Sequence, residues 1–340
     1  MKLETDIYFT KEYCELCALA EEGEVTEFKF NNELGEITYL FLKRPINVNR
    51  SFSGYYDIVS PYGYGGPVIR ELNDETDGGK KKLVSGYIDS FNEYCVDNHI
   101  VSEFVRFHPI IGNALDFKDA LDITYNRHTV GTNVGAYDDP VAAECTKSCR
   151  KRIRQALNKG ITYKVTYRPE SLDCFKEIYY ATMDRNEASE YYYFHDEYFD
   201  TCLRTMNDKL LTVEAIYTDP EHPENESQII AMNLCFIDGD YAHIHLSGTR
   251  DEFLHFSPAY ILRYALIEWC KANGVKMIHH GGGRSSSEED SLYQFKKQFG
   301  QNTSFDFYLG KKILLPDVYE DLCHKMNKPV DADYFPAYRA

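Results

Sequence analysis

YAHIHLSGTRDEFLHFSPAYILRYALIEWCKANGVKMIHHG, residues 241–281, predicts a strand, a helix and a second strand in succession. Apolar and polar residues alternate over 241–248, which is the period of a half-buried strand. A helix is expected at 258–273, with Ser257 as its cap and Pro258 in its first turn. The second strand is expected at 275–280. This succession is typical of an α/β arrangement, and the flanking segments extend it.

The segments on either side continue a regular order. The remaining strands are expected at 162–167, 209–217, 228–237 and 303–309, and the remaining helices at 171–186, 196–206 and 288–299. The order from 162 to 309 is therefore β-α-α-β-β-β-α-β-α-β, which is similar to that of the GNAT acyltransferase fold. We expect one mixed sheet over 162–309, with strands 241–248 and 275–280 splayed apart to make a donor site.

The first half carries a looser version of the same order. Its helices are expected at 10–20 and 81–97, and its strands at 25–31, 36–44, 55–59, 100–107 and 121–128. A helix over 139–159 has Pro140 at its start and Gly160 past its end. The predicted fold class is therefore α/β (α+β), with two tandem GNAT-like domains, each a mixed sheet flanked by helices. The domains are expected at 1–138 and 161–340, joined by a linking helix within 139–160.

The composition and net charge of the chain limit the kinds of molecule that it can bind. The chain has 340 residues, and 37 basic against 54 acidic side chains give a net charge of −17. Such a surface repels long nucleic-acid duplexes and anionic membranes, so neither DNA binding nor membrane insertion is expected. Only Cys14 and Cys17 form a CxxC pair, which does not make a zinc site. The first residues lack the apolar run of a signal peptide, and we expect a reduced, cytoplasmic protein.

Several motifs resemble those of the Fem-type (FemAB-like) branch of the GNAT superfamily, over about residues 25–310. They are Gly66-Pro67-Val68, Thr182-Met183-Asp184-Arg185, His280-Gly281-Gly282-Gly283 and Phe295-Lys296 within the segment that ends at Gly300. The resemblance implies an acyltransferase that moves an acyl or aminoacyl group to an amine. The acceptor would be a sugar nucleotide, a surface-polysaccharide precursor or a peptidoglycan precursor. A non-catalytic homologue that binds sugar nucleotides is the alternative from another class.

The donor site is expected at the start of the 258–273 helix, at Ser257, Ala259 and Tyr260. GNAT enzymes that use acetyl-CoA usually carry glycines here, whereas Tyr260 is bulky and Pro258 lacks an N–H group. Against an aminoacyl-tRNA donor stand the acidic net charge and His279-His280, where tRNA-using members commonly have an acidic residue. The expected donor is an acyl-CoA, with aminoacyl-tRNA as the alternative, and no tightly bound cofactor is expected.

The resemblance places Phe295 and Lys296 where donor and acceptor meet. A lysine ammonium there can stabilise the oxyanion that develops on the carbonyl. His243 and His245 share one face of a strand, and either could be the general base, with His245 named as the catalytic candidate. No third ligand accompanies these two histidines, so no metal is expected.

The acceptor is expected in a groove between the halves. Arg185 carries over from the family as a phosphate contact, and Tyr62, Tyr64 and Arg70 flank the Gly66-Pro67 turn. A separate basic cluster, uninterrupted by acids, lies in 145–169. It comprises Lys147, Arg150, Lys151, Arg152, Arg154, Lys159, Lys164 and Arg168. Such a cluster can attract a phosphate-rich ligand, including the acceptor end of a tRNA.

Overall fold

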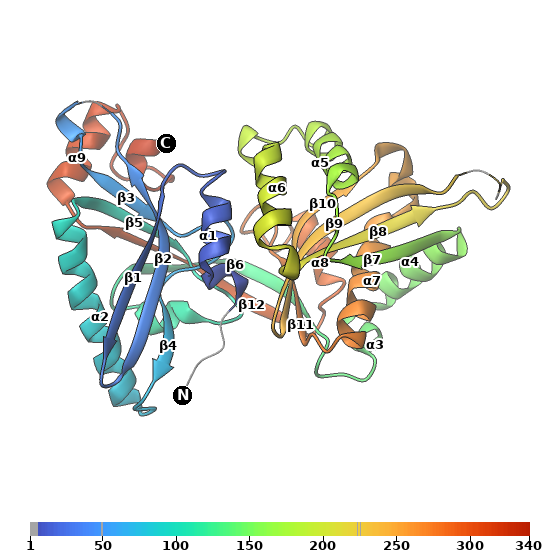
Figure 1. Ribbon diagram of the computed structural model, residues 1–340, viewed down its shortest axis with the longest axis horizontal. Coiled ribbons are helices and arrows are strands. Elements are labelled where there is room, and N and C mark those ends of the chain that lie inside the picture. The colour runs from blue at the N-terminus through green and yellow to red at the C-terminus, as the bar shows by residue number, and fades with distance from the viewer. Residues whose placement is uncertain (1–5, 49, 223, 225) are drawn as a thin grey trace. The chain divides into compact units, whose positions relative to one another are not determined.

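The computed structural model describes residues 6–48, 50–222, 224 and 226–340 (Figure 1). Its packing divides the chain into two compact units. Unit 1 comprises Met1–Asn126 and Asp306–Ala340, and unit 2 comprises Arg127–Phe305. This division differs from the expected boundaries at 138 and 161, because the last segment of the chain packs with the first.

Unit 1 contains a mixed sheet in the order β1-β2-β3-β5-β12, with β4 paired to β2. The strands are β1 (Glu24–Asn32), β2 (Gly35–Pro45), β3 (Tyr56–Val59), β4 (Val68–Leu72), β5 (Ile100–Arg106) and β12 (Ser304–Ile313). The helices are α1 (Lys11–Cys17), α2 (Asp77–Asp97) and α9 (Pro316–Lys325). Only β3 and β5 run parallel among the pairs described in this unit. Thr10 caps α1, since its hydroxyl accepts from the Tyr13 N–H.

In unit 2 the strand order is β6-β11-β10-β9-β8-β7, with β10 and β11 parallel and the other neighbours antiparallel. Its strands are β6 (Asp122–Asn133, from Arg127 onward), β7 (Ile161–Tyr167), β8 (Leu210–Tyr217), β9 (Gln228–Asp238), β10 (Tyr241–Thr249) and β11 (Met277–Gly281). Its helices are α3 (Pro140–Glu144), α4 (Lys147–Asn158), α5 (Asp173–Arg185), α6 (Asp196–Thr205), α7 (Pro258–Ala272) and α8 (Ser291–Lys297). The predicted element order and fold class are confirmed. The expectation of one sheet over 162–309 is wrong, because the strand expected at 303–309 pairs with β5 of unit 1, whereas β6 borders β11 in unit 2.

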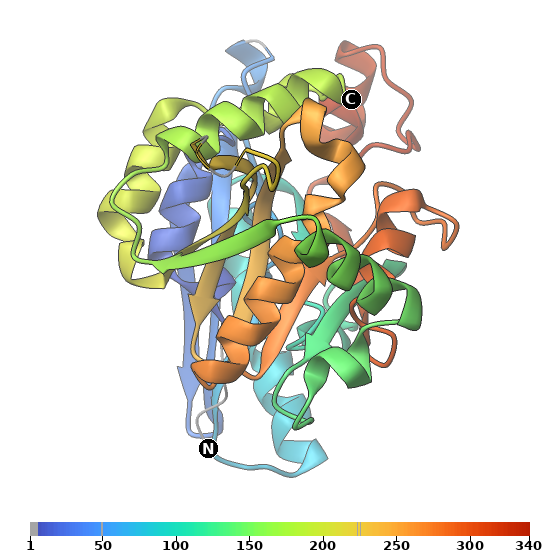
Figure 2. The same ribbon diagram turned by 90° about the vertical axis from the view of Figure 1, so that its right-hand side faces the viewer.

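The helices of unit 2 cover both faces of its sheet. A buried core joins α4 and α7 to alternate residues of β8, and the two helices lie next to each other in Figure 2. On β9, Cys235 belongs to this core, whereas the next residue, Phe236, contacts His245 on the other face. Helices α5 and α6 lie on that second face, where Tyr198 of α6 meets His245. Successive residues of one strand thus contact the helices on opposite faces of the sheet.

The predicted splay is confirmed. Strands β10 and β11 pair in parallel over only three registers, which end at His243 with His279. Beyond that point β10 continues along β9 to Thr249, and β11 continues along β6 to Gly281. The ends of two parallel neighbours therefore separate, as a donor site requires.

The predicted linking helix is wrong as a single element. Helices α3 and α4 are separated at Cys145, which is extended, and Thr146 starts α4 by accepting from the Cys149 N–H. Pro140 does open α3, and Gly160 follows α4 with a φ of 85°. Strand β4 and helix α9 are elements that the sequence analysis did not predict. Among the described residues, no helix combines the length and apolarity needed to cross a bilayer.

Candidate active site

Lys296 lies at the carboxyl end of β11, the strand that borders the splay. Asp290 begins α8 by accepting from the N–H groups of Leu292 at 3.0 Å and Tyr293 at 2.9 Å. One and a half turns later, Lys296 Nζ donates to the Gly282 carbonyl at 2.7 Å. This hydrogen bond ties the glycine segment after β11 to α8 and fixes the position of Lys296 Nζ beside the splay.

Helices α7 and α8 meet through an aromatic cluster. The ring of Tyr260 lies 5.2 Å from Phe295 and 5.4 Å from Phe299, both measured between centroids. Its hydroxyl donates to Gln298 Oε1 at 3.2 Å. The structure thus brings together three of the predicted site residues, Tyr260, Phe295 and Lys296.

Ser257 and Ala259 lie at the start of α7, next to this cluster. The expected side-chain cap is wrong: Ser257 adopts the left-handed region, at φ 56°, and its hydroxyl caps no N–H group. The left-handed conformation of Ser257 follows from the 3-10 helix Asp251–Phe256 before it. The Ser257 N–H donates to the Leu254 carbonyl at 2.9 Å and closes the last turn of that helix. Pro258 opens α7 as predicted. The α7 start therefore offers neither a hydroxyl cap nor a full set of N–H donors.

Arg263 projects from α7 into the same cluster, and the sequence analysis did not single it out. The residue is only 4% exposed. Its guanidinium carbon lies 4.6 Å from the Phe295 ring centroid and 5.5 Å from that of Phe299. No ion pair of Arg263 occurs in the described parts of the chain, and its Nε–H has no hydrogen-bond partner there. Burial accordingly lowers its pKa to about 10.

The electrostatics of Lys296 follow from this neighbour. Burial is the largest cause that lowers the Lys296 pKa, to about 7, and the charges of Arg263 and Arg127 lower it further. Asp290 opposes them. A lysine in water has a pKa of about 10.4, so Lys296 loses its proton far more easily than an exposed lysine.

His280 is held in one tautomer beneath Lys296. The Thr132 hydroxyl donates to the Phe299 carbonyl at 2.6 Å, so it must accept from His280 Nε2–H at 2.8 Å. Nδ1 is therefore the unprotonated nitrogen. It is buried and has no partner in the described structure. Burial first, and then Arg263 and Lys296, keep the His280 pKa well below its usual range. His279 points to the other face of β11, toward Thr129 Oγ1 at 2.9 Å.

His245, the expected general base, is not brought to Lys296. It lies on the sheet face covered by α5 and α6, where its Nε2 is 2.6 Å from the Tyr198 hydroxyl. Burial, and then the charge of His243, lower its pKa to about 3. So low a pKa leaves the imidazole neutral and weakly basic at physiological pH. Its position makes it part of the packing between α6 and the sheet.

Arg185 ends α5 on the same side. Its guanidinium donates to the Thr249 carbonyl at 2.9 Å and pairs with Asp251. The Thr182 hydroxyl also accepts from the Thr249 N–H at 2.9 Å. The Thr182–Arg185 motif thus ties α5 to the end of β10 and to the turn that leads into α7.

The other predicted acceptor residues belong to unit 1 and surround its first described segment. Tyr64 packs edge-on to Tyr8, at a centroid distance of 5.3 Å. The Tyr62 carbonyl accepts from the Tyr13 hydroxyl at 2.8 Å. Arg70 donates to the Phe9 carbonyl at 2.7 Å and to Thr38 Oγ1 at 2.8 Å. Arg70 therefore braces the segment against β2.

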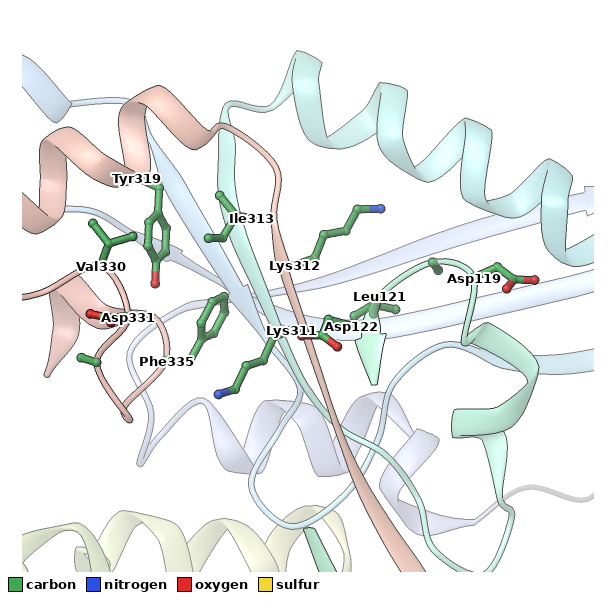
Figure 3. A pocket seen from close by; sticks show the side chains of 12 residues that line it. Asp119, Leu121, Asp122, Lys311, Lys312, Ile313, Tyr319, Val330, Asp331 and Phe335 are labelled. Atoms are coloured by element: carbon green, nitrogen blue, oxygen red, sulfur yellow. The ribbon is translucent and has the colours of Figure 1, made fainter. Parts of the chain in front are cut away.

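A cavity of about 580 Å³ also lies in unit 1, between β12, α9 and the segment 330–335 (Figure 3). Lys311, Lys312 and Asp331 are among its lining side chains, with Tyr319 and Phe335 supplying apolar surface. None of the predicted site residues lines this cavity.

With this geometry in place, comparison with known proteins identifies the class. Residues 144–297 match the family model described as acetyltransferase (GNAT) domain, so the chain carries the acyltransferase domain of that superfamily. One curated relative is UDP-N-acetylmuramoylpentapeptide-lysine N(6)-alanyltransferase from Weissella viridescens, 28% identical over 101 residues. That match covers 29% of this chain and 30% of the relative. The chain thus spans about a third of the curated relative that it matches.

Solved structures show the same fold over nearly the whole chain. FemX superposes with a TM-score of 0.69 at 14% identity. The match covers 94% of this chain and 95% of the FemX chain. The C-terminal domain of a putative lysylphosphatidylglycerol synthetase from Agrobacterium fabrum gives 0.55 at 11% identity, covering 93% and 95%. The family match covers a little under half of the chain, and the superposition on FemX at 14% identity shows the fold alone.

The state of His245 predicts how stability depends on pH. Its folded pKa of about 3 lies below the ordinary histidine value of about 6.5, so unfolding takes up a proton between these limits. We expect the free energy of unfolding to fall as pH drops from 6.5 toward 4. The His245→Gln variant should lose less, by up to about 1.4 kcal/mol per pH unit. Chemical denaturation at several pH values measures both.

The matched control is the exposed His324 of α9, since His324→Gln should leave the wild-type pH dependence intact. Equal slopes in wild type and His245→Gln would show that His245 is not held neutral in the folded protein.

Proposed function

We propose that this chain transfers an aminoacyl group to an amine of a peptidoglycan precursor, in the manner that the name of its alanyltransferase relative describes. The acceptor would be the lysine side chain of a UDP-linked muramoyl pentapeptide. The single observation that carries this proposal is the cluster of Lys296, Phe295 and Tyr260 beside the β10–β11 splay. A protein that only binds sugar nucleotides has no need of a desolvated lysine at this place.

The chemistry needs no covalent intermediate. An amine that enters the splay attacks the carbonyl carbon of the donor directly, provided that both are held in line. Lys296 Nζ is fixed at the end of β11, where the donor carbonyl and the amine would meet, and Phe295 and Tyr260 give the carbonyl an apolar wall. Lys296 would then touch the reacting atoms, whereas His245 lies on the other side of the sheet.

The donor that these features favour is an aminoacyl-tRNA. The matched family model is described as an acetyltransferase domain, which keeps an acyl-CoA donor as the alternative. The start of α7 offers few free N–H groups to a pyrophosphate, since Pro258 has none and the Tyr260 N–H donates to the Ser257 carbonyl at 3.1 Å. The relative transfers an alanyl group by its name. The start of α7 and the name of the relative both argue against acetyl-CoA as the donor.

A basic surface leads to the donor cluster. Helix α4 buries Cys149, Ile153 and Ala156, so its basic side chains face outward. Among the described residues, none of the eight basic side chains in 145–169 forms an ion pair. Arg152 connects this surface to the site, because its guanidinium carbon lies 5.6 Å from the Tyr260 ring centroid. A polyanion bound along α4 would therefore reach the splay.

On the acceptor side, Arg185 is proposed to hold a phosphate of the precursor. Its present partner Asp251 has an exposed side chain, at 57%, and such an ion pair contributes little to stability. A phosphate can therefore replace it. Tyr62, Tyr64 and Arg70 remain proposed acceptor residues of unit 1.

Replacing Lys296 tests the assignment of the site. We expect Lys296→Met to lower turnover at least a hundredfold, because one amine at the reacting atoms is lost. Folding should be unaffected, since methionine fills the same space without a buried charge. The assay follows alanyl transfer from alanyl-tRNA to the UDP-linked pentapeptide.

The neighbouring Lys297, also on α8, is the control, and Lys297→Met should keep the wild-type turnover. If both variants transfer at the wild-type rate, Lys296 is not in the active site.

Reversing charge on α4 tests the donor. The triple variant Lys151→Glu, Arg152→Glu, Arg154→Glu should raise the KM for aminoacyl-tRNA steeply and flatten its salt dependence. Each lost phosphate contact should remove about 0.7–0.9 from the log–log salt slope. Arg150 is left in place because it donates to the Ala142 carbonyl at 2.9 Å.

A second triple variant in unit 1, Lys81→Glu, Lys82→Glu, Lys118→Glu, carries the same change of net charge and should behave as the wild type. A similar loss in both triples would mean that net charge, rather than the α4 surface, governs donor binding. If the chain used acetyl-CoA as a donor and did not use alanyl-tRNA, the proposed donor would be wrong.

A further inference from the structure

Aromatic rings of α7, and of the 3-10 helix before it, face basic side chains of α4 and of the residue that follows it. The guanidinium carbon of Arg152 lies 5.6 Å from the ring centroid of Tyr260. Lys159 Nζ lies 5.4 Å from the ring centroid of Phe256. Both basic side chains are exposed, and each lies where the electrostatic attraction between a cation and an aromatic face operates. The donor cluster therefore continues outward into a surface of paired cations and rings.

The same pattern continues along β7. Tyr163 packs edge-on against Tyr264 of α7 at a centroid distance of 5.8 Å, and Tyr167 lies 6.1 Å from Trp269. Arg168 follows β7, and its guanidinium carbon lies 5.2 Å from the Tyr167 ring centroid. Tyr163 is 39% exposed and Tyr167 is 44% exposed. Together with Arg152, Lys159, Phe256 and Tyr260, these side chains form what we call the α7–β7 surface.

The place of β7 in the sheet leaves this surface open. Strand β7 is the last in the order of unit 2, and it pairs only with β8 among the described strands. Helices α4 and α7 lie beside it (Figure 1). Apolar side chains exposed one at a time are common on proteins and need no explanation. Rings that gather with cations on one face are typical of a binding surface.

The charge of this surface and its rings together identify the class of ligand. Among the described residues, Arg152, Lys159 and Arg168 form no ion pair, so each can bind a phosphate. Aromatic faces stack on nucleobases of any sequence. A ligand that carries a phosphate beside every flat base matches both parts of the pattern. Single-stranded nucleic acid is such a ligand.

Acidic side chains at the border of the surface favour a single strand over a duplex. Burial raises the pKa of Tyr264, and the charges of Glu268 and Asp139 raise it further, so two acids lie near this ring. A duplex presents the phosphates of both strands and hides its base faces, so it would meet these acids without gaining any stacking. A single strand can turn its phosphates toward the cations and its bases toward the rings.

We infer that the α7–β7 surface binds the single-stranded 3′ end of the donor tRNA, with bases stacked on Tyr163 and Tyr167 and phosphates held by the three cations. This inference rests on the proposed function and deepens it, because it names the part of the donor that the rings hold. Strand β7 rises about 20 Å from its first to its last residue, which is the length of about six stacked nucleotides at about 3.4 Å each. The surface begins at Tyr260, so a strand bound along it brings its terminal ribose to the donor cluster.

Trp269 reports binding directly, because it is the single tryptophan of the chain and lies against Tyr167. The probe is a hexaribonucleotide that ends in CCA, titrated into the protein while the fluorescence of Trp269 is followed. We expect saturable quenching, because a base that stacks on Tyr167 comes next to the indole. Contacts of the three cations with three phosphates should give the affinity a log–log salt slope of about −2.

Replacing Tyr163 tests stacking. Tyr163→Leu should weaken binding about tenfold, because one stacking ring is lost. Tyr163→Phe keeps the ring and should bind like the wild type. Glu268→Gln should tighten binding, because it removes a negative charge near Tyr264. The matched control is Tyr334→Leu in unit 1, where a tyrosine that is 55% exposed is replaced without effect on binding.

Two further probes separate stacking from charge. The same hexaribonucleotide in a duplex with its complement, and inorganic polyphosphate, both supply phosphates without free base faces. Both should bind more weakly than the single strand, and Tyr163→Leu should change neither affinity. If the duplex or the polyphosphate bound as tightly as the single strand, charge alone would govern binding and the inference would be wrong.

The remaining outcomes also decide the inference. Absence of quenching by the single strand, or equal affinities in wild type and Tyr163→Leu, would overturn it. A dimer that Tyr163→Leu dissociates would overturn it as well, because the surface would then be an interface between two copies of the chain. If the wild type binds the single strand but transfers no aminoacyl group, the proposed function fails while the surface still binds RNA. If alanyl transfer proceeds with the same KM for alanyl-tRNA in wild type and Tyr163→Leu, the proposed function stands and this inference fails.

Discussion

The site depends on the place where β10 and β11 stop pairing. Three parallel registers join the two strands, and the pairing ends at His243. Each strand then follows its other neighbour, so the sheet of unit 2 opens at its centre without breaking. The helix after β10 and the glycines after β11 both begin at this opening. Helix α7 contributes Tyr260 and Arg263, and the glycine segment holds Lys296 by a carbonyl. A fully paired sheet would leave no entry for a carbonyl between them.

A second constraint is the cost of burying charge. The cluster between α7 and α8 holds a guanidinium, an amine and an imidazole in apolar surroundings, with aromatic faces in place of carboxylates. Such an arrangement does not contribute to stability, because desolvated cations without acidic partners oppose folding. It does prepare the protonation states of its members. Burial lowers the pKa of Arg263 to about 10 and that of Lys296 to about 7, and keeps the His280 pKa well below its usual range.

Much of the fold could be predicted from local signals. Pro140 and Gly160 delimit helical structure, and Thr10 caps α1. The Phe295-Lys296 pair is assigned to the proposed site by its resemblance to a known family. Other features depend on tertiary contacts that no local pattern reveals. The left-handed turn at Ser257 follows from the 3-10 helix before it. The extended residue Cys145 breaks a stretch with helical periodicity because Thr146 caps a new helix. Arg263 sits in an apolar helix, and only packing shows that no acid meets it. The face on which His245 lies depends on sheet layering, which strand periodicity leaves open.

The central claim is that an aminoacyl group reaches a peptidoglycan precursor at the Lys296 site. Mass spectrometry of the UDP-linked muramoyl pentapeptide tests it most directly, after incubation of the wild-type chain with alanyl-tRNA, and with acetyl-CoA in a parallel reaction. We predict one added alanyl residue on the lysine side chain, only with alanyl-tRNA and only when Lys296 is present. An unmodified precursor with alanyl-tRNA, or an acetyl group in its place with acetyl-CoA, would contradict the account.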